Sequence, residues 1–108
     1  MKLYGLKNCD SCRKAKKELE AAGNELEFID VRATPLDKAT LDAFLTAFGA
    51  DKLVNKKSTT WRQLDETERA KDPLQLLVEN PSLMKRPVIE TDKGCFLGWT
   101  AETKSHLL

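Results

Sequence analysis

The chain has 108 residues, which is enough for one domain with a hydrophobic core that needs no disulfide support. Its 18 Lys and Arg residues balance 17 Asp and Glu residues, so charge gives no case for direct binding to nucleic acid or to an acidic membrane. There is no apolar signal segment, no apolar run of membrane-spanning length and no even set of cysteines typical of secreted proteins, so we expect a cytoplasmic protein.

The opening of the chain predicts a strand, a helix and a second strand. Residues 2–6 alternate between polar and apolar before a turn signal, as a short strand does. Apolar residues at helical spacing predict a helix over 11–22 that ends at Gly23. The apolar residues within 25–31 predict the second strand. Such a β-α-β unit normally holds two parallel strands joined by a right-handed crossover.

The middle of the chain predicts helices. Residues 34–37 look like a helix start with Pro35 near the first turn, and an apolar stripe follows as far as Gly49. A short helix is predicted within 61–69 and another over 73–79.

The end of the chain predicts a strand, a hairpin turn and an antiparallel return strand within 85–98, then a short helix from Thr100. The complete order is that of an α/β, thioredoxin-like fold with a mixed four-stranded sheet. Residues 1–108 are then a single domain that carries a helical insert at about 35–80.

Two cysteines, Cys9 and Cys12, lie where the first strand ends and the first helix begins. A helix N-terminus carries about half a positive charge, which stabilises a thiolate and lowers its pKa. Cys9 is therefore the expected nucleophile, and Cys12 could attack a mixed disulfide at Cys9 and resolve it. The competing interpretation is that both are small buried side chains, and it is strongest for Cys12, which lies on the inward stripe of the helix.

A zinc site is the other use of such a pair, and it needs about four ligands. Only Cys95 and His106 remain in the chain, far away and without matching spacing. We therefore expect no metal. Cys95 is predicted to be at least half-buried in a strand, and His106 to be exposed and without a catalytic role.

Five segments together resemble one known family, the arsenate reductase (ArsC)/Spx family, and within it the YffB-like proteins most closely. The resemblance covers nearly the whole chain, and the segments are residues 3–10, 13–15, 59–67, 85–87 and 97–99. It implies a thioredoxin-like core with a helical insert, a nucleophilic cysteine at Cys9, and an arginine–proline pair at Arg86 and Pro87 with the proline in cis.

The resemblance also implies where a substrate would bind. Arg86 is expected to hold an anionic group, such as a glutathione carboxylate or an oxyanion, with help from Arg62 or Lys57, because a guanidinium fork suits such groups. Asn8 and Pro87 are the other expected substrate-binding positions. A solvated loop charge is the competing interpretation for Arg62 and Lys57.

The leading function is a thiol-disulfide oxidoreductase with no tightly bound cofactor, with glutathione as a candidate co-substrate and glutaredoxin as a candidate partner. Arsenate reduction is one alternative. Family members that use glutathione bind the oxyanion with three arginines, however, and only Arg86 matches here, while Asn55 and Trp99 take the other two positions. The second alternative is an Spx-like redox-sensing regulator that binds RNA polymerase, since the C-x-x-C pair resembles the Spx switch.

Overall fold

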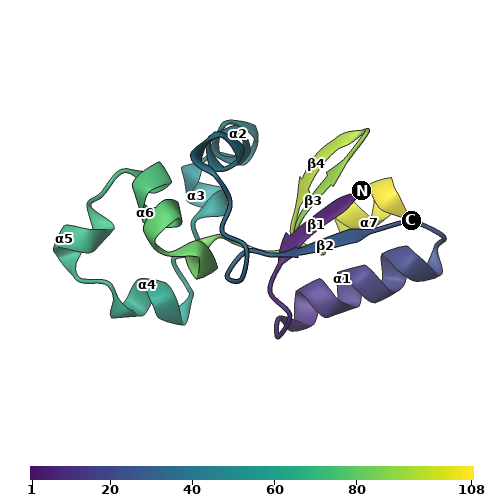
Figure 1. Ribbon diagram of the computed structural model, residues 1–108, viewed down its shortest axis with the longest axis horizontal. Helices are drawn as coiled ribbons and strands as arrows, with labels where there is room; N and C mark the ends of the chain where they lie inside the picture. Colours follow the sequence, from purple (N-terminus) through teal and green to yellow (C-terminus); the bar gives the residue numbers. More distant parts are fainter. The chain divides into compact units, whose positions relative to one another are not determined.

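The computed structural model describes residues 1–108, which divide into two compact units (Figure 1). The first unit combines Met1–Thr34 with Arg86–Leu108, and the second is Pro35–Lys85, within which the expected insert falls. The first unit contains β1 (Lys2–Gly5), α1 (Asp10–Ala21), β2 (Glu27–Asp30), β3 (Val88–Thr91), β4 (Gly94–Leu97) and α7 (Ala101–Leu107). The second contains α2 (Lys38–Phe48), α3 (Ala50–Leu53), α4 (Thr59–Gln63), α5 (Glu66–Arg69), α6 (Pro73–Glu79) and the 3₁₀ helix η1 (Pro81–Leu83). None of the helices is both long and apolar enough to cross a membrane.

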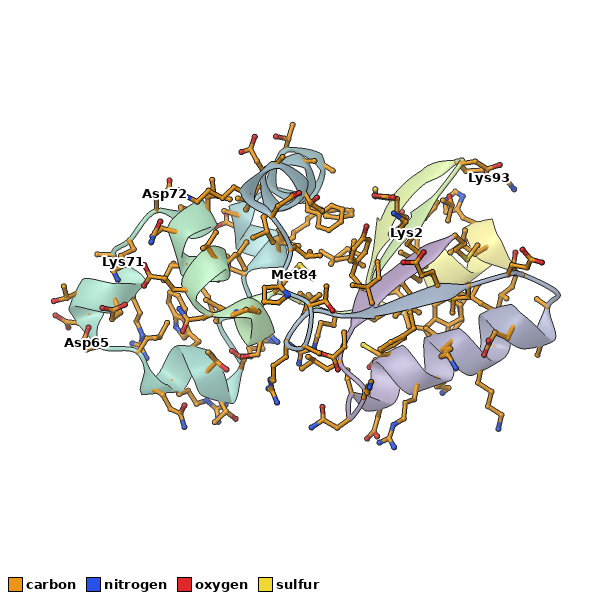
Figure 2. All side chains as sticks on the ribbon, in the orientation of Figure 1. Lys2, Asp65, Lys71, Asp72, Met84 and Lys93 are labelled. Carbon is orange, nitrogen blue, oxygen red and sulfur yellow. The ribbon has the colours of Figure 1, made fainter.

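The first unit is built on one four-stranded sheet with the order β2-β1-β3-β4. β1 is parallel to β2 and antiparallel to β3, and β3 forms an antiparallel hairpin with β4. Lys93 lies at the tip of that hairpin (Figure 2). The mixed sheet and the flanking helices confirm the predicted α/β, thioredoxin-like fold class.

One apolar row crosses this sheet from edge to edge. The strand register places four side chains opposite one another, one from each strand: Phe28, Leu3, Ile89 and Phe96. Paired residues point to the same face of a sheet, so this row forms a continuous apolar surface. The inward stripe of α1 packs against it through Cys12, Ala15 and Leu19. These contacts fix α1, and with it the cysteine pair, on the sheet.

The second unit departs from the sequence prediction at two helix boundaries. α2 begins at Lys38, because the Asp37 carboxylate caps it by accepting a 2.8 Å hydrogen bond from the Thr40 N–H. Placing Pro35 near the first helical turn was therefore wrong, since it precedes the cap. The single helix expected within 61–69 is divided into α4 and α5, because Asp65 caps a new helix at Glu66.

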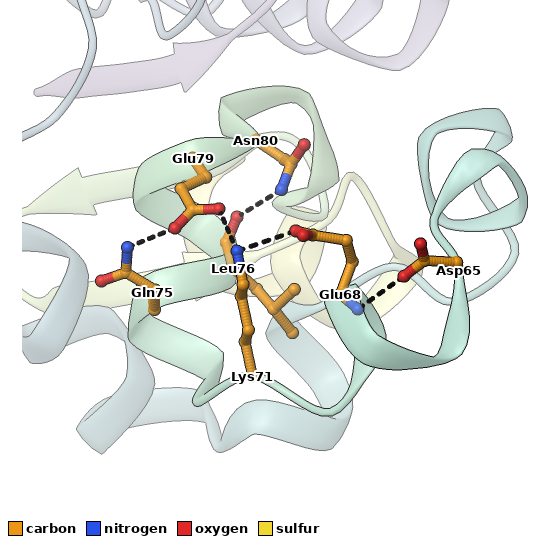
Figure 3. A network of polar contacts seen from close by, with 7 residues as sticks. All are labelled: Asp65, Glu68, Lys71, Gln75, Leu76, Glu79 and Asn80. Atoms are coloured by element: carbon orange, nitrogen blue, oxygen red, sulfur yellow. Dashed lines mark hydrogen bonds and ion pairs between the residues drawn. The ribbon is translucent and has the colours of Figure 1, made fainter.

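A polar network joins α5 to α6 within the second unit (Figure 3). The Lys71 ammonium lies 2.8 Å from Glu79 and 2.9 Å from Glu68, and Gln75 also donates to Glu79. Hydrogen bonds to the two carboxylates, first Glu79 and then Glu68, raise the pKa of Lys71 to about 12. Because these groups are in contact with solvent, we expect the network to add little to the stability of the unit.

Candidate active site

Cys9 is held at the junction of β1 and α1 by backbone geometry. Its backbone is extended, with φ −93° and ψ 120°, and its N–H donates to the Leu6 carbonyl at 3.1 Å. Its own carbonyl accepts the first helical hydrogen bond of α1 from the Arg13 N–H at 3.0 Å. Cys9 is therefore the N-cap residue, which places its sulfur beside the unpaired N–H groups of the first turn. Asn8 is exposed in the preceding turn.

Asp30, at the end of β2, anchors the loop that leads to Cys9. Its carboxylate accepts hydrogen bonds from the backbone N–H groups of Lys7 at 3.2 Å, Arg32 at 2.9 Å and Ala33 at 3.0 Å. The Ala33 hydrogen bond, supported by the others, lowers the pKa of Asp30. A single ionised side chain thus ties the cysteine loop to the neighbouring strand.

The Cys9 thiol has a lowered pKa. Burial of the half-exposed side chain raises the pKa, but the Cys12 backbone N–H, the Cys12 thiol and the Arg86 guanidinium together outweigh it by favouring the thiolate. Sulfur is a weak acceptor, and Cys9 makes no conventional capping hydrogen bond. The charge on the thiolate is therefore stabilised by the first turn of α1, through the Cys12 N–H and thiol, and by Arg86.

Cys12 has the opposite character. Its side chain is fully buried, and burial is the main cause that raises the pKa of its thiol far above the ordinary value. The neighbouring Cys9 thiolate raises it further, by charge and by accepting the thiol proton, while the Leu6 backbone N–H acts in the other direction. Cys12 is thus a protonated thiol that donates to Cys9. Its burial is also what the competing interpretation, an inert core residue, predicts.

Arg86 and Pro87 lie directly before β3, in the same unit as the two cysteines. The peptide bond between them is cis, as the family resemblance implies, and Pro87 is buried. The Arg86 guanidinium interacts with the Cys9 sulfur by hydrogen bond and by charge. The structure therefore brings together three of the predicted site residues, Cys9, Cys12 and Arg86.

Lys57 and Arg62 belong to the second unit, and both are exposed. The nearby Trp61 is partly buried, and the centroid of its ring lies 5.7 Å from the Lys56 Nζ and 5.2 Å from the Arg69 Cζ. Arg69 also donates two hydrogen bonds to the Trp61 carbonyl. Trp61 thus takes part in the structure of its own unit, and substrate roles for Lys57 and Arg62 remain predictions.

The remaining reactive side chains of the first unit lie on other elements. Cys95 is half-exposed on β4, where burial and the charge of Glu90 raise the pKa of its thiol. His106 is exposed, and its ring packs against Phe96 at 5.4 Å. Trp99 packs against the core between α1 and the sheet and donates a hydrogen bond to Glu18 of α1. No group of three or more His, Cys, Asp or Glu side chains is arranged to hold a metal ion.

Replacing Arg86 with alanine is expected to slow alkylation of Cys9 by iodoacetamide several-fold at pH 6–7. The guanidinium lowers the pKa of Cys9, so its loss leaves less thiolate at that pH. Alkylation rates across pH, with peptide mapping, measure this. Arg13→Ala is the matched control, because Arg13 is on the exposed side of α1 and its charge is paired with Asp10 at 2.7 Å. An equal effect of both variants would contradict the assignment.

Comparison with known proteins assigns a family to this chain. The model of the ArsC family matches residues 4–106. An uncharacterised protein of Haemophilus influenzae is 44% identical over 101 residues, covering 90% of this chain and 89% of that protein. The global transcriptional regulator Spx of Bacillus subtilis is 29% identical over 107 residues, covering 93% of this chain and 80% of Spx. A solved structure of a protein named YFFB matches with a TM-score of 0.91 at 30% identity, covering 99% of this chain and 97% of that one. The resemblance inferred from sequence is confirmed, and the chain belongs to the ArsC family.

Proposed function

We propose that this protein is a thiol-disulfide oxidoreductase in which Cys9 is the nucleophile and Cys12 is the resolving thiol. One observation carries the proposal. Two neighbouring thiols have pKa values shifted in opposite directions, downward at Cys9 and upward at Cys12. Such a pair separates the roles of attacking thiolate and protonated partner.

In the first step the Cys9 thiolate attacks one sulfur of a substrate disulfide. A bond forms between Cys9 and that sulfur, the substrate S–S bond breaks, and the second sulfur leaves as a thiolate that takes a proton from solvent. The product is a mixed disulfide at Cys9. Low pKa favours this step because the thiolate, and not the thiol, is the nucleophile.

The second step follows from the loss of charge at Cys9. In the mixed disulfide Cys9 is neutral, so the two effects by which its thiolate raises the pKa of Cys12 are removed. Cys12 then loses its proton to solvent more easily and attacks the Cys9 sulfur. The Cys9–Cys12 bond forms, the bond from Cys9 to the substrate sulfur breaks, and the other half of the substrate leaves as a thiolate that takes up a proton. The protein has given up two electrons and now holds a Cys9–Cys12 disulfide. Two molecules of glutathione restore the dithiol and leave as glutathione disulfide.

Arg86 is the proposed anion-binding group of this site. It is already within interaction range of the Cys9 sulfur, so a carboxylate or oxyanion held by its guanidinium would be next to the nucleophile. Asn8 precedes Cys9 and Pro87 follows Arg86, so both are proposed to contact the substrate. Lys57 and Arg62 are further proposed substrate contacts. Glutaredoxin is a proposed partner for the return of electrons.

In the test, the reduced protein is mixed with a small dialkyl disulfide, with and without glutathione, and the products are identified by mass spectrometry. The expected product without glutathione is a monomer lighter by two hydrogens, with Cys9 and Cys12 linked in one peptide. Turnover is expected once glutathione is added. A stable adduct at Cys9 with Cys12 still reduced would contradict the resolving role. Absence of any reaction at Cys9 would contradict the whole proposal.

Two alternatives have a specific observation behind them. The guanidinium beside Cys9 is compatible with arsenate reduction, and turnover of arsenate with glutathione and glutaredoxin would support it. The similarity to Spx favours a redox-sensing regulator that binds RNA polymerase. That function would be supported instead if this protein bound RNA polymerase in only one oxidation state of Cys9 and Cys12 and turned over no disulfide.

A further inference from the structure

Gly5, the last residue of β1, touches the sulfur of Cys12 more closely than any side chain would allow. A β-carbon built on Gly5 would lie 2.4 Å from the Cys12 Sγ and 3.1 Å from its Cβ. Sulfur and carbon in ordinary contact are well over 3 Å apart, so the first distance is a clear overlap. Both residues are buried, and sequence analysis gave Gly5 no role.

Backbone conformation does not explain this glycine. Four other glycines, Gly23, Gly49, Gly94 and Gly98, have positive φ values and so occupy backbone conformations that disfavour other residues. Gly5 is not among them and pairs with Asp30 in the regular register of the sheet. A glycine inside a strand weakens the strand, and it often marks a place where another group approaches the backbone closely. Here that group is the thiol of Cys12.

We propose that Gly5 is a positioning residue for the cysteine pair. Because Gly5 has no side chain, the Cys12 thiol can occupy the space against β1, where it is held and directed to Cys9. The N–H of Leu6, the residue directly after β1, interacts with the same sulfur. The inference rests on the proposed function, because it assigns Gly5 to the resolving thiol of that mechanism.

A methyl group at position 5 would force the Cys12 sulfur to move. α1 is fixed on the sheet by Ala15 and Leu19, so the sulfur would have to rotate away or the start of α1 would have to lift. Either movement separates the thiol from Leu6 and from Cys9. The thiolate of Cys9 would then lose the Cys12 thiol as a donor and keep Arg86 as its remaining charged neighbour.

The test compares Gly5→Ala, Cys12→Ala and the double variant with the wild type, all reduced and without substrate. The pH profile of Cys9 alkylation and the midpoint of urea unfolding are measured. We expect Gly5→Ala to move the Cys9 profile to higher pH by as much as Cys12→Ala does. We expect no further shift of the Cys9 profile in the double variant, because it lacks the sulfur that occupies the space beside Gly5. For the same reason Gly5→Ala should lower the unfolding midpoint far more in the wild type than in Cys12→Ala.

An unchanged Cys9 profile in Gly5→Ala, or equal losses of unfolding midpoint in both backgrounds, would overturn the inference. If Gly5→Ala does not fold, removal of the sulfur in the double variant must restore folding; a double variant that also fails to fold overturns the inference as well. The measurements need neither oxidant nor substrate. Failure of the proposed function, seen as a wild type that forms no Cys9–Cys12 disulfide, is therefore distinguishable from failure of the role of Gly5.

Discussion

Cys9→Ser is expected to reduce the rate of disulfide exchange by on the order of 10³-fold or more, because it removes the nucleophile itself. A serine hydroxyl at this position is not ionised at neutral pH, and the Arg86 guanidinium that favours a thiolate has no thiolate to stabilise. Turnover of a small disulfide in the presence of glutathione measures the loss.

Cys95→Ser is the matched control for this variant. Cys95 is half-exposed like Cys9, but burial and Glu90 raise its pKa. We expect the control to retain the wild-type rate. If Cys95→Ser lost activity and Cys9→Ser kept it, the nucleophile would have been assigned to the wrong thiol.

Leu19→Ala is expected to destabilise the first unit by about 2–5 kcal/mol, the usual cost of removing a buried leucine side chain. Leu19 is fully buried on the inward stripe of α1 and packs against the apolar row of the sheet. Urea unfolding followed by tryptophan fluorescence measures the loss. A Trp61→Phe background leaves Trp99 of the first unit as the single tryptophan.

Lys17→Ala serves as the control on the same helix. Lys17 is exposed on α1, so we expect a change within about 0.5 kcal/mol. Comparable losses in the two variants would show that the stability of α1 comes from helix propensity and not from its packing on the sheet.

Much of the fold could be predicted because its sequence signals are local. The helix over 73–79 was predicted with its observed bounds, since Pro73 suits a first helical position and Asn80 ends the apolar pattern. The start of α2 was misplaced because Thr34 and Asp37 are both good caps, and only the structure shows that Asp37 bonds the Thr40 N–H.

The candidate site was predictable where it depends on one segment. The C-x-x-C spacing at a helix start indicated Cys9 and Cys12 without any structure. Arg86 could be connected to Cys9 only through the family resemblance, because their contact depends on the pairing of β1 with β3, far apart in sequence. Gly5 was missed for a similar reason: the overlap with Cys12 depends on how closely α1 lies on β1.

The central position of β1 has a consequence for how the protein is made. β1 lies between β2, which follows it early in the chain, and β3, which is separated from it by the whole second unit. The ribosome therefore synthesises the continuous Pro35–Lys85 segment before β3, the strand that pairs with the other edge of β1. Contacts between residues so far apart in the sequence form late. Until residues 86–97 emerge, the nascent Cys9 lacks its arginine and one edge of β1 is open. A truncated translation product that ends before Arg86 would therefore carry both cysteines without the guanidinium that helps to stabilise the Cys9 thiolate.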